Sequence, residues 1–267
     1  MDPMKDSASI TSEDDSDPRV RDVLTRPEEL LTTLTVDPAD PRRLYRQIAD
    51  QLAQFIALKR LPPGTRLPAE RDLAEALGVS RPSVREALIA LEVEGRVEVR
   101  GGSGVVVLGQ NGKPRAGQDV SPGPFDVIRA RWIIESEAAA LAATNATPQH
   151  LQQMKLALMD MRSERTHSPK ATAADQRFHF AIAQASNNVA LLLVIKQLWD
   201  MRTGDLYMQL ESHFTGEDIW AKASEEHSAL MDAIASRDAD AAREAMRRHM
   251  KNAEVRFASG WRSPTSE

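Results

Sequence analysis

The sequence predicts two folded parts in series: an N-terminal winged helix-turn-helix, of mixed α and β structure, followed by an all-α antiparallel helical bundle. Three observations predict this. A helix-turn-helix pattern of apolar residues runs from Leu67 to Leu91, and two short β-runs around a glycine-rich turn follow it. After residue 108 only helical periodicity is found.

The first pattern lies in the stretch LPAERDLAEALGVSRPSVREALIAL, residues 67–91. Apolar residues recur at helical spacing up to Gly78, which suits a helix C-terminus because glycine tolerates positive φ. Ser80 then suits the N-cap of a second helix, and Pro82 suits its first turn, where a missing N–H costs nothing. The apolar stripe of the second helix consists of Val84, Ala87, Leu88 and Leu91.

Two helices joined by a short turn that contains glycine are typical of DNA-binding proteins, in which the second helix enters the major groove. Short αα-hairpins in ordinary bundles have a similar pattern, so the residues that follow matter. Two β-runs, 97–100 and 105–107, flank the glycine-rich turn 101–104, and this pattern indicates the wing of a winged helix. The candidate DNA contacts are Arg71, Arg81 and Arg85.

Charge is distributed unevenly along the chain. The whole chain carries a formal net charge of −5, which is unexpected for a nucleic-acid binder. Residues 42–115 nevertheless hold 13 basic and 8 acidic side chains, a net charge of +5, whereas residues 1–41 carry −7 and residues 116–267 carry −3. Positive charge is therefore concentrated around the helix-turn-helix, where phosphate neutralisation requires it.

The remaining composition excludes several classes of protein. The hydrophobic fraction of 42% fits a globular chain, and no apolar run approaches the roughly 20 residues of a membrane span. The acidic N-terminus lacks the apolar core of a secretory signal, and the absence of cysteine excludes disulfides and thiolate metal sites. We therefore expect a soluble, cytoplasmic protein.

The segments around the helix-turn-helix complete the first domain. Residues 1–40 are rich in Asp, Glu, Ser, Thr and Pro without a sustained period, which predicts a disordered acidic extension. An amphipathic helix is predicted from Leu44 to the Pro-Pro-Gly of residues 62–64, and residues 65–67 are expected to pair with the wing as a short strand. The winged-helix domain is expected to span residues 41–109.

The run from Leu44 through the helix-turn-helix to the glycine wing resembles the DNA-binding domain of the GntR family of bacterial transcription regulators. The resemblance implies that Arg71, Ser80, Arg81, Ser83, Arg85, Gly101 and Gly102 contact the operator. Arginine suits bidentate contact with guanine, whereas hydroxyl and glycine N–H groups suit phosphates. Ala69 departs from the serine that many family members have, so one helix loses its N-cap at a cost of about 1 kcal/mol.

The second half of the chain is expected to consist of a linker, a domain and a tail. Residues 110–123 hold Gly, Pro, Gln, Asn and Asp without a period and predict a linker, residues 124–258 an all-α domain, and residues 259–267 a tail. The predicted helices cover residues 125–143, 147–165, 171–185, 189–210, 218–235 and 239–257. Thr147 with Pro148, and Asp238, are expected to begin two of them.

Four side chains in this bundle share the chemistry of metal ligands. Asp175 and His179 lie one turn apart on one helix face, and His227 and His249 each fall in an apolar stripe, so all should point inward. Buried aspartate and histidine are costly unless paired, and one divalent ion would satisfy all four. An Asp–His pair with core histidines held by ordinary hydrogen bonds would give the same spacing, so both interpretations stay open here.

Residues 125–257 resemble the FCD effector domain of the FadR subfamily of GntR regulators. The residues that carry this resemblance are Arg131, Glu135, Asp175, Phe178, His179, Asn188, His227 and His249. It implies that the Asp and three His bind a divalent metal, most often zinc or nickel, beside a pocket for a small carboxylate. Arg131 and Asn188 would then bind the effector, and a salt bridge to Glu135 is an equal alternative for Arg131.

Other residues bear on the identity of the effector. The cluster of Trp199, Met201 and Arg202 with Trp220 resembles FCD regulators of sugar-acid catabolism, which implies a hexuronate. Ordinary core packing of aromatic and methionine side chains is the alternative. Three further histidines without a partner at metal-ligand spacing are expected to be surface or structural residues: His150, His167 and His213.

We therefore predict a DNA-binding transcription regulator, a homodimer on a palindromic operator, whose repression is relieved by an organic acid bound beside a metal ion. No catalytic residues are assigned, and no enzyme activity is expected. Two alternatives stay open from the sequence. One is a metalloenzyme that uses the three His and one Asp, and the other is a DNA-binding module whose bundle serves only for dimerisation.

Overall fold

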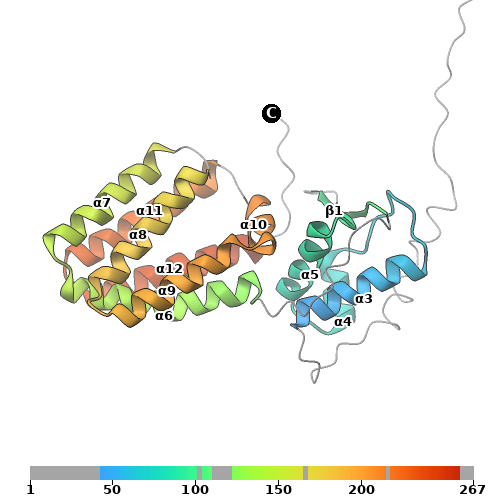
Figure 1. The fold of residues 1–267 in the computed structure, drawn as a ribbon, viewed down its shortest axis with the longest axis horizontal. Helices are drawn as coiled ribbons and strands as arrows, with labels where there is room; N and C mark the ends of the chain where they lie inside the picture. The colour runs from blue at the N-terminus through green and yellow to red at the C-terminus, as the bar shows by residue number, and fades with distance from the viewer. Residues whose placement is uncertain (1–42, 101–103, 110–121, 165–167, 215–216, 259–267) are drawn as a thin grey trace, which may run out of the picture.

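The computed structural model describes residues 43–100, 104–109, 122–164, 168–214 and 217–258. The expectations for residues 1–40 and 259–267, for most of the linker, for His167 and for the wing glycines Gly101 and Gly102 lie outside these ranges. The described residues up to 109 form an N-terminal lobe, and those from 122 onward form a helical lobe beside it (Figure 1).

The N-terminal lobe begins with α3 (Leu44–Leu58), α4 (Glu70–Leu77) and α5 (Arg81–Val93). Gly78 ends α4 in the left-handed conformation, with φ at 62°, and the Ser80 side chain accepts the N–H of Ser83 at the start of α5. Ala69 offers no side-chain cap to α4, as its residue type predicts. The predicted helix-turn-helix is therefore confirmed, with α5 as its second, recognition helix.

A two-stranded antiparallel wing follows the recognition helix. Strand β1 (Val97–Arg100) pairs with β2 (Gly104–Val107), with Val97 opposite Val107. The segment 65–67 pairs with the wing as predicted, through an antiparallel bridge between Arg66 and Val106 and backbone hydrogen bonds of Thr65 and Leu67 to β2. Glu92, near the end of α5, accepts the N–H of Val99 at 2.8 Å, so the recognition helix and the wing are directly bonded.

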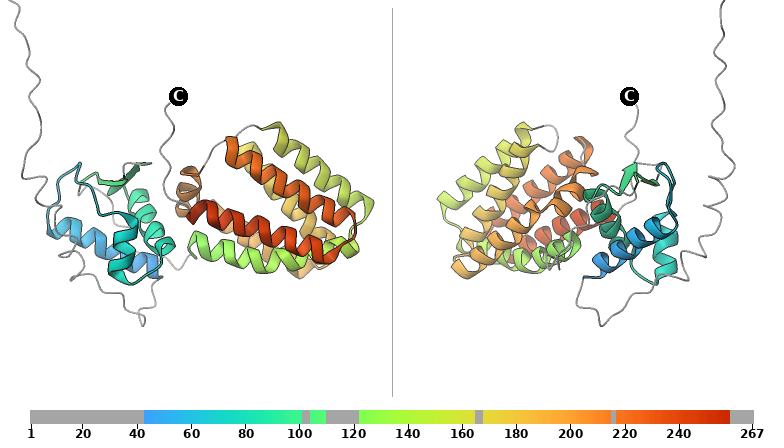
Figure 2. Two further views of the ribbon diagram at one scale, coloured as in Figure 1. Left: turned by 180° about the vertical axis from the view of Figure 1, so that it is seen from behind. Right: turned by 45° about the vertical axis from the view of Figure 1, so that its right-hand side comes forward.

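The helical lobe consists of α6 (Pro124–Asn145), α7 (Pro148–Ser163), α8 (Pro169–Ala185), α9 (Val189–Asp200), the 3₁₀ turn η1 (Met201–Thr203), α10 (Asp205–Ser212), α11 (Glu217–Ala235) and α12 (Ala239–Ala258). Its long helices lie side by side (Figures 1 and 2), with α6 packed along α12 and α7 along α8. Thr147 and Asp238 cap α7 and α12 as predicted. None of the described helices is long and apolar enough to cross a membrane.

The single helix predicted over residues 189–210 is wrong, because the chain breaks between α9 and α10. Gly204 is extended, with φ −69° and ψ 145°, and α10 starts directly after it. Glycine inside a helix costs about 1 kcal/mol relative to alanine, which makes this position a favourable place to interrupt one. The break places Arg202 and Tyr207 in buried positions.

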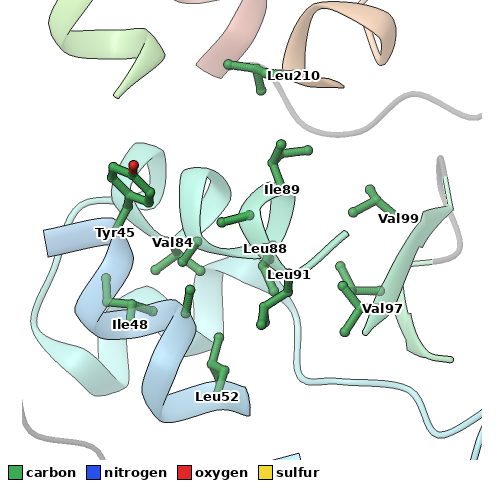
Figure 3. Close-up of a cluster of buried hydrophobic side chains, with 14 of the residues drawn as sticks. Tyr45, Ile48, Leu52, Val84, Leu88, Ile89, Leu91, Val97, Val99 and Leu210 are labelled. Atoms are coloured by element: carbon green, nitrogen blue, oxygen red, sulfur yellow. The ribbon is translucent and has the colours of Figure 1, made fainter. Parts of the chain in front are cut away.

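A buried apolar cluster joins the two lobes. It includes Leu88 and Ile89 of α5 together with Leu210 of α10, and Figure 3 shows Leu210 across from Ile89. Phe125 at the start of α6 and Phe257 at the end of α12 belong to the same cluster. The two lobes therefore share buried apolar side chains and are packed against each other.

Candidate functional site

Three buried histidines from three helices converge in the helical lobe. His179 of α8, His227 of α11 and His249 of α12 offer ring nitrogens that lie within 4.8 Å of one another. Asp175, one turn before His179, places Oδ1 3.0 Å from Nε2 of His227 and 3.4 Å from Nε2 of His179. The structure thus brings together the four residues predicted as metal ligands.

Two carboxylates hold the outer nitrogens of this cluster. Nδ1 of His179 contacts Oε2 of Glu135, and Nδ1 of His249 lies 2.8 Å from Oε2 of Glu226. Each contact leaves the Nε2 atom of that ring for the centre of the cluster. Carboxylate–histidine pairs of this kind orient the ligands of metal sites and raise their basicity. Glu226 is not among the residues predicted from the sequence, although its position immediately before His227 was a usable signal.

The charges of the cluster are strongly coupled. Burial alone would raise the pKa of Asp175, but the neighbouring imidazoles of His179 and His227 hold it well below its usual value. Burial also lowers the pKa of His179, yet Glu135 and Asp175 outweigh that effect and raise it. For His249, burial and then the charge of His227 lower the pKa to about 3, which leaves this imidazole neutral.

The residues fit a divalent cation. Oδ1 of Asp175 is buried and has no hydrogen-bond partner among the described residues, although two ring nitrogens face it. The Nε2 atoms of His179 and His227 lie 3.3 Å apart. One ion between these atoms would satisfy them together, and three imidazoles with one carboxylate are donors that zinc and nickel accept.

A pocket adjoins this cluster. Its lining includes Asp175, His227 and His249, and from the neighbouring elements Arg131, Arg202, Tyr207, Glu211, Trp220 and Phe257. The two guanidinium groups stack on Trp199, because the central carbons of Arg131 and Arg202 each lie 4.2 Å from its ring centroid. The pocket therefore combines a candidate metal site with two fixed positive charges.

Of the two residues predicted to bind the effector, Arg131 and Asn188, only Arg131 lines the described pocket. Arg131 lines the pocket, and its Nε donates to Oε1 of Glu135 at 2.6 Å, so the salt bridge expected as an alternative is present. Asn188 does not belong to the pocket lining. Its Oδ1 accepts the N–H groups of Ala190 and Leu191 as the N-cap of α9, so its side chain serves the helix terminus instead.

Most of the described residues predicted to contact DNA lie at the surface around the start of the recognition helix. The Arg71 side chain is 78% exposed, and that of Arg81 is 53% exposed while its Nε donates to Glu70 at 2.9 Å. Ser80 and Ser83 share a hydrogen bond at an exposed position. This surface is therefore accessible to a phosphate backbone.

Arg85 is the exception among the predicted DNA contacts. Its side chain is only 1% exposed, and its guanidinium group donates to both carboxylate oxygens of Glu70 and to the main-chain carbonyl of Phe257 at the end of α12. In this arrangement the helical lobe covers the group that was expected to reach DNA. This contact could not be predicted from the sequence, because the partner lies 172 residues away.

Further polar contacts join the lobes next to Arg85. Oε2 of Glu92 accepts from Nε2 of Gln209 at 3.1 Å and lies 2.6 Å from Nε2 of His213. Its other oxygen, Oε1, accepts the N–H of Val99 in the wing. Glu86 accepts the N–H of Phe125 at 3.0 Å, and burial raises its pKa to about 7. His213, expected to be a surface or structural residue, thus contacts the recognition helix.

Each of the two lobes matches a known protein family. Residues 44–107 match the family model described as bacterial regulatory proteins, gntR family, and residues 126–252 match that of the FCD domain. The Uxu operon transcriptional regulator of Escherichia coli K12 is 35% identical over 224 residues, covering 81% of this chain and 87% of that protein. The Exu regulon transcriptional regulator of the same strain is also 35% identical over 224 residues, with coverages of 81% and 85%.

The chain also matches a solved structure. The structure of Streptococcus agalactiae GntR is 26% identical and matches with a TM-score of 0.43, covering 80% of this chain and 100% of that one.

Proposed function

The chain belongs to the gntR family of bacterial regulatory proteins and carries an FCD domain, and on this premise we propose that it is a homodimeric repressor released from its operator by an organic acid. The family makes it a DNA-binding transcription regulator with a C-terminal effector domain. It is therefore not an enzyme, and the interpretations as a metalloenzyme or as a bundle for dimerisation alone are set aside.

The observation that carries this proposal is the pocket beside the buried Asp and His cluster. We infer that Asp175, His179, His227 and His249 hold a zinc or nickel ion. When bound, the ion supplies a positive charge that attracts a carboxylate. Arg131, fixed by Glu135 and Trp199, presents a second positive charge to the same pocket. Both features suit a small anionic effector.

A sugar acid such as a hexuronate is the effector class that we favour. The pocket is lined by Arg202 and Trp220, two of the residues whose pattern resembles regulators of sugar-acid catabolism. Two relatives at 35% identity are named for the Uxu operon and the Exu regulon.

We propose that DNA binding follows the winged-helix mode, with α5 of each protomer in successive major grooves of a palindromic operator. The exposed Arg71 and Arg81 and the hydroxyls of Ser80 and Ser83 support this assignment. So does the net charge of +5 on residues 42–115. A protein that acts on bacterial operators works in the cytoplasm.

The contact between the lobes connects the pocket to the DNA-binding lobe. Phe257 lines the pocket, and its main-chain carbonyl accepts from Arg85. We infer that the packed arrangement, in which Arg85 is covered, binds the operator weakly and that the effector favours it. A ligand shifts such an equilibrium only if it binds the two arrangements with different affinity. Phe257 provides for this, because it belongs both to the pocket lining and to the contact between the lobes.

DNA contact is tested by replacing Arg81 with alanine. We expect binding to operator DNA, selected from a random library by the full-length protein, to weaken by about 1–3 kcal/mol. Arg177→Ala is the matched control, because Arg177 is an equally exposed arginine on α8 that pairs with Asp160. Fluorescence anisotropy measures both variants, and equal affinities for the two would contradict the assignment of Arg81.

Effector and metal are tested together by thermal-shift screening of small organic acids with and without chelator. A ligand that stabilises the metal-loaded protein alone supports the site, since binding to the folded state raises its stability. His227→Ala should abolish this stabilisation, whereas His150→Ala, a histidine in the cap of α7, should retain it. Equal stabilisation of the chelated protein would contradict the metal site.

A further inference from the structure

Arg202 is a charged group of the pocket that belongs neither to the proposed metal ligands nor to the DNA surface. We propose that Arg202 and Glu211 together recognise hydroxyl groups of the effector, so that the pocket selects a polyhydroxylated acid over a simple carboxylate. This inference rests on the proposed function and concerns the part of the ligand that lies away from the metal.

The position of Arg202 is fixed by its surroundings. It lies in η1, at the break between α9 and α10, and is 9% exposed although it lines the pocket. Its guanidinium group stacks on Trp199 and lies 5.3 Å from the ring centroid of Tyr207. Stacking on aromatic rings holds the plane of the guanidinium group, so little conformational freedom is lost when a ligand binds to it.

The guanidinium group of Arg202 has N–H donors that its contacts with Glu211 and Asp175 do not use. Its Nη2 atom lies 2.7 Å from Oε1 of Glu211, and its Nη1 atom lies 3.3 Å from Oδ2 of Asp175. Its Nε is buried without a hydrogen-bond partner among the described residues. A guanidinium group carries five N–H donors, so these two carboxylate contacts leave capacity for ligand oxygens. A buried donor left unsatisfied is costly, which favours a ligand that supplies an acceptor.

Glu211 supplies the complementary acceptor. It extends from α10, lines the same pocket and keeps 18% of its side chain exposed. A hydroxyl group both donates and accepts, so adjacent hydroxyls match a neighbouring arginine and carboxylate. A carboxylate without hydroxyls only accepts and gains nothing from Glu211. Sites built to hydrogen-bond a hydroxyl reject analogues that lack it far more strongly than apolar pockets reject an extra group.

A purely structural role makes a different prediction. If Arg202 only neutralised Asp175, its removal would disturb the metal ligand, and metal and every acid would be lost together. A recognition role predicts that the protein keeps its metal and its affinity for a simple carboxylate. The two roles are therefore separated by measuring metal content and two ligands in the same variant.

The experiment is isothermal titration of the full-length, metal-loaded protein. The probes are D-glucuronate and D-galacturonate, compared with tetrahydropyran-2-carboxylate, which has the same ring and carboxylate but no ring hydroxyls. We expect at least one hexuronate to bind the unmodified protein at least about tenfold more tightly than this analogue. Arg202→Met should lower hexuronate affinity by about tenfold to a hundredfold and leave the analogue and the metal content unchanged.

A second variant and a control complete the test. Glu211→Gln keeps the side-chain shape and should also reduce the preference for hexuronate, which covers the case in which Arg202→Met does not fold. Arg177→Met removes an exposed arginine outside the pocket and should change neither affinity. Unchanged hexuronate affinity in both pocket variants would overturn the inference. So would joint loss of metal and both acids in a folded Arg202→Met.

The unmodified protein separates this inference from the proposed function. If it binds the hexuronates and the analogue equally well, the recognition of hydroxyls is wrong and the acid-responsive regulator stands. If it binds no carboxylate at all, the proposed function fails, and this inference fails with it.

Discussion

Among the residues of the candidate metal site, His227 differs from its two partners. Nδ1 of His179 and Nδ1 of His249 each contact a carboxylate, whereas Nδ1 of His227 is buried without a hydrogen-bond partner among the described residues. The orientation of the site therefore depends on Glu135 and Glu226. Glu226 also accepts from Asn252 at 2.8 Å and from Arg256 at 2.9 Å, so it is itself held in place.

Replacing Glu226 by glutamine should weaken metal binding by about tenfold to a hundredfold, because the carboxylate that orients His249 is lost. Competition with a chelator of known affinity measures the change. Glu225→Gln is the matched control, since Glu225 is an exposed neighbour on the same helix. Equal metal affinities in the two variants would show that Glu226 does not position the ligand.

Glu86 should make the stability of the protein depend on pH. Burial raises its pKa from 4.5 to about 7; the hydrogen bond from the N–H of Phe125 acts against this, the nearby Asp126 adds to it, and Arg129 and Arg43 oppose it. Between these values the folded protein binds more protons than the unfolded chain, so this contribution to stability is full below pH 4.5 and lost as pH rises through 7.

We expect the free energy of unfolding to fall by about 1 kcal/mol from pH 6 to pH 8 through this group. Glu86→Gln removes the titration and keeps an oxygen that accepts the N–H of Phe125. Urea unfolding of both proteins at the two pH values isolates the effect, because other titrating groups cancel in the difference. A parallel pH dependence in the two proteins would rule out Glu86 as its source.

Single residues could be predicted from the sequence where a local pattern reports them. The spacing of Asp175 and His179 and the apolar stripes around His227 and His249 predicted that four side chains point inward, and the structure brings these four together. The partners of Arg85, Arg202 and Glu92 could not be predicted in the same way. Each of these contacts joins helices that are distant in sequence, so it exists only once the lobes or helices have packed.

At the scale of secondary structure, α10 contacts both the pocket and the N-terminal lobe. Glu211 and Tyr207 line the pocket, while Leu210 packs in the cluster that includes α5. The sequence predicted helix boundaries well where a cap or proline marks them, as at Thr147 and Asp238. It missed the break at Gly204, because the apolar pattern continues through it and one glycine does not by itself end a helix.

His213, which follows α10, provides a test of this element. His213→Ala removes a contact with Glu92 and leaves the bond from Glu92 to the wing intact. We expect effector affinity to stay unchanged, while the effect of the acid on operator affinity shrinks by about threefold to tenfold. DNA titrations with and without acid measure this, with His150→Ala as control. A full response in His213→Ala would show that α10 does not carry the signal through this contact.

At the scale of the whole molecule, the two lobes form one connected structure. The buried cluster around Leu88 and Leu210 and the bond from Arg85 to Phe257 place the recognition helix against the effector lobe. Two separate domains were predictable from the sequence, since helical periodicity and the glycine-rich wing are local. Their contact was not, because nothing local in Arg85 distinguishes an arginine that meets DNA from one that meets a carbonyl.

The central claim is that an acid held beside the metal weakens operator binding by stabilising the packed arrangement of the lobes. The most direct measurement is the operator affinity of the metal-loaded protein with and without a saturating hexuronate, repeated after chelation. We expect the acid to weaken operator binding at least about tenfold, a coupling free energy within the usual 1–3 kcal/mol, and chelation to abolish the effect. Operator affinity that stays the same while the acid is bound to the metal-loaded protein would contradict the claim.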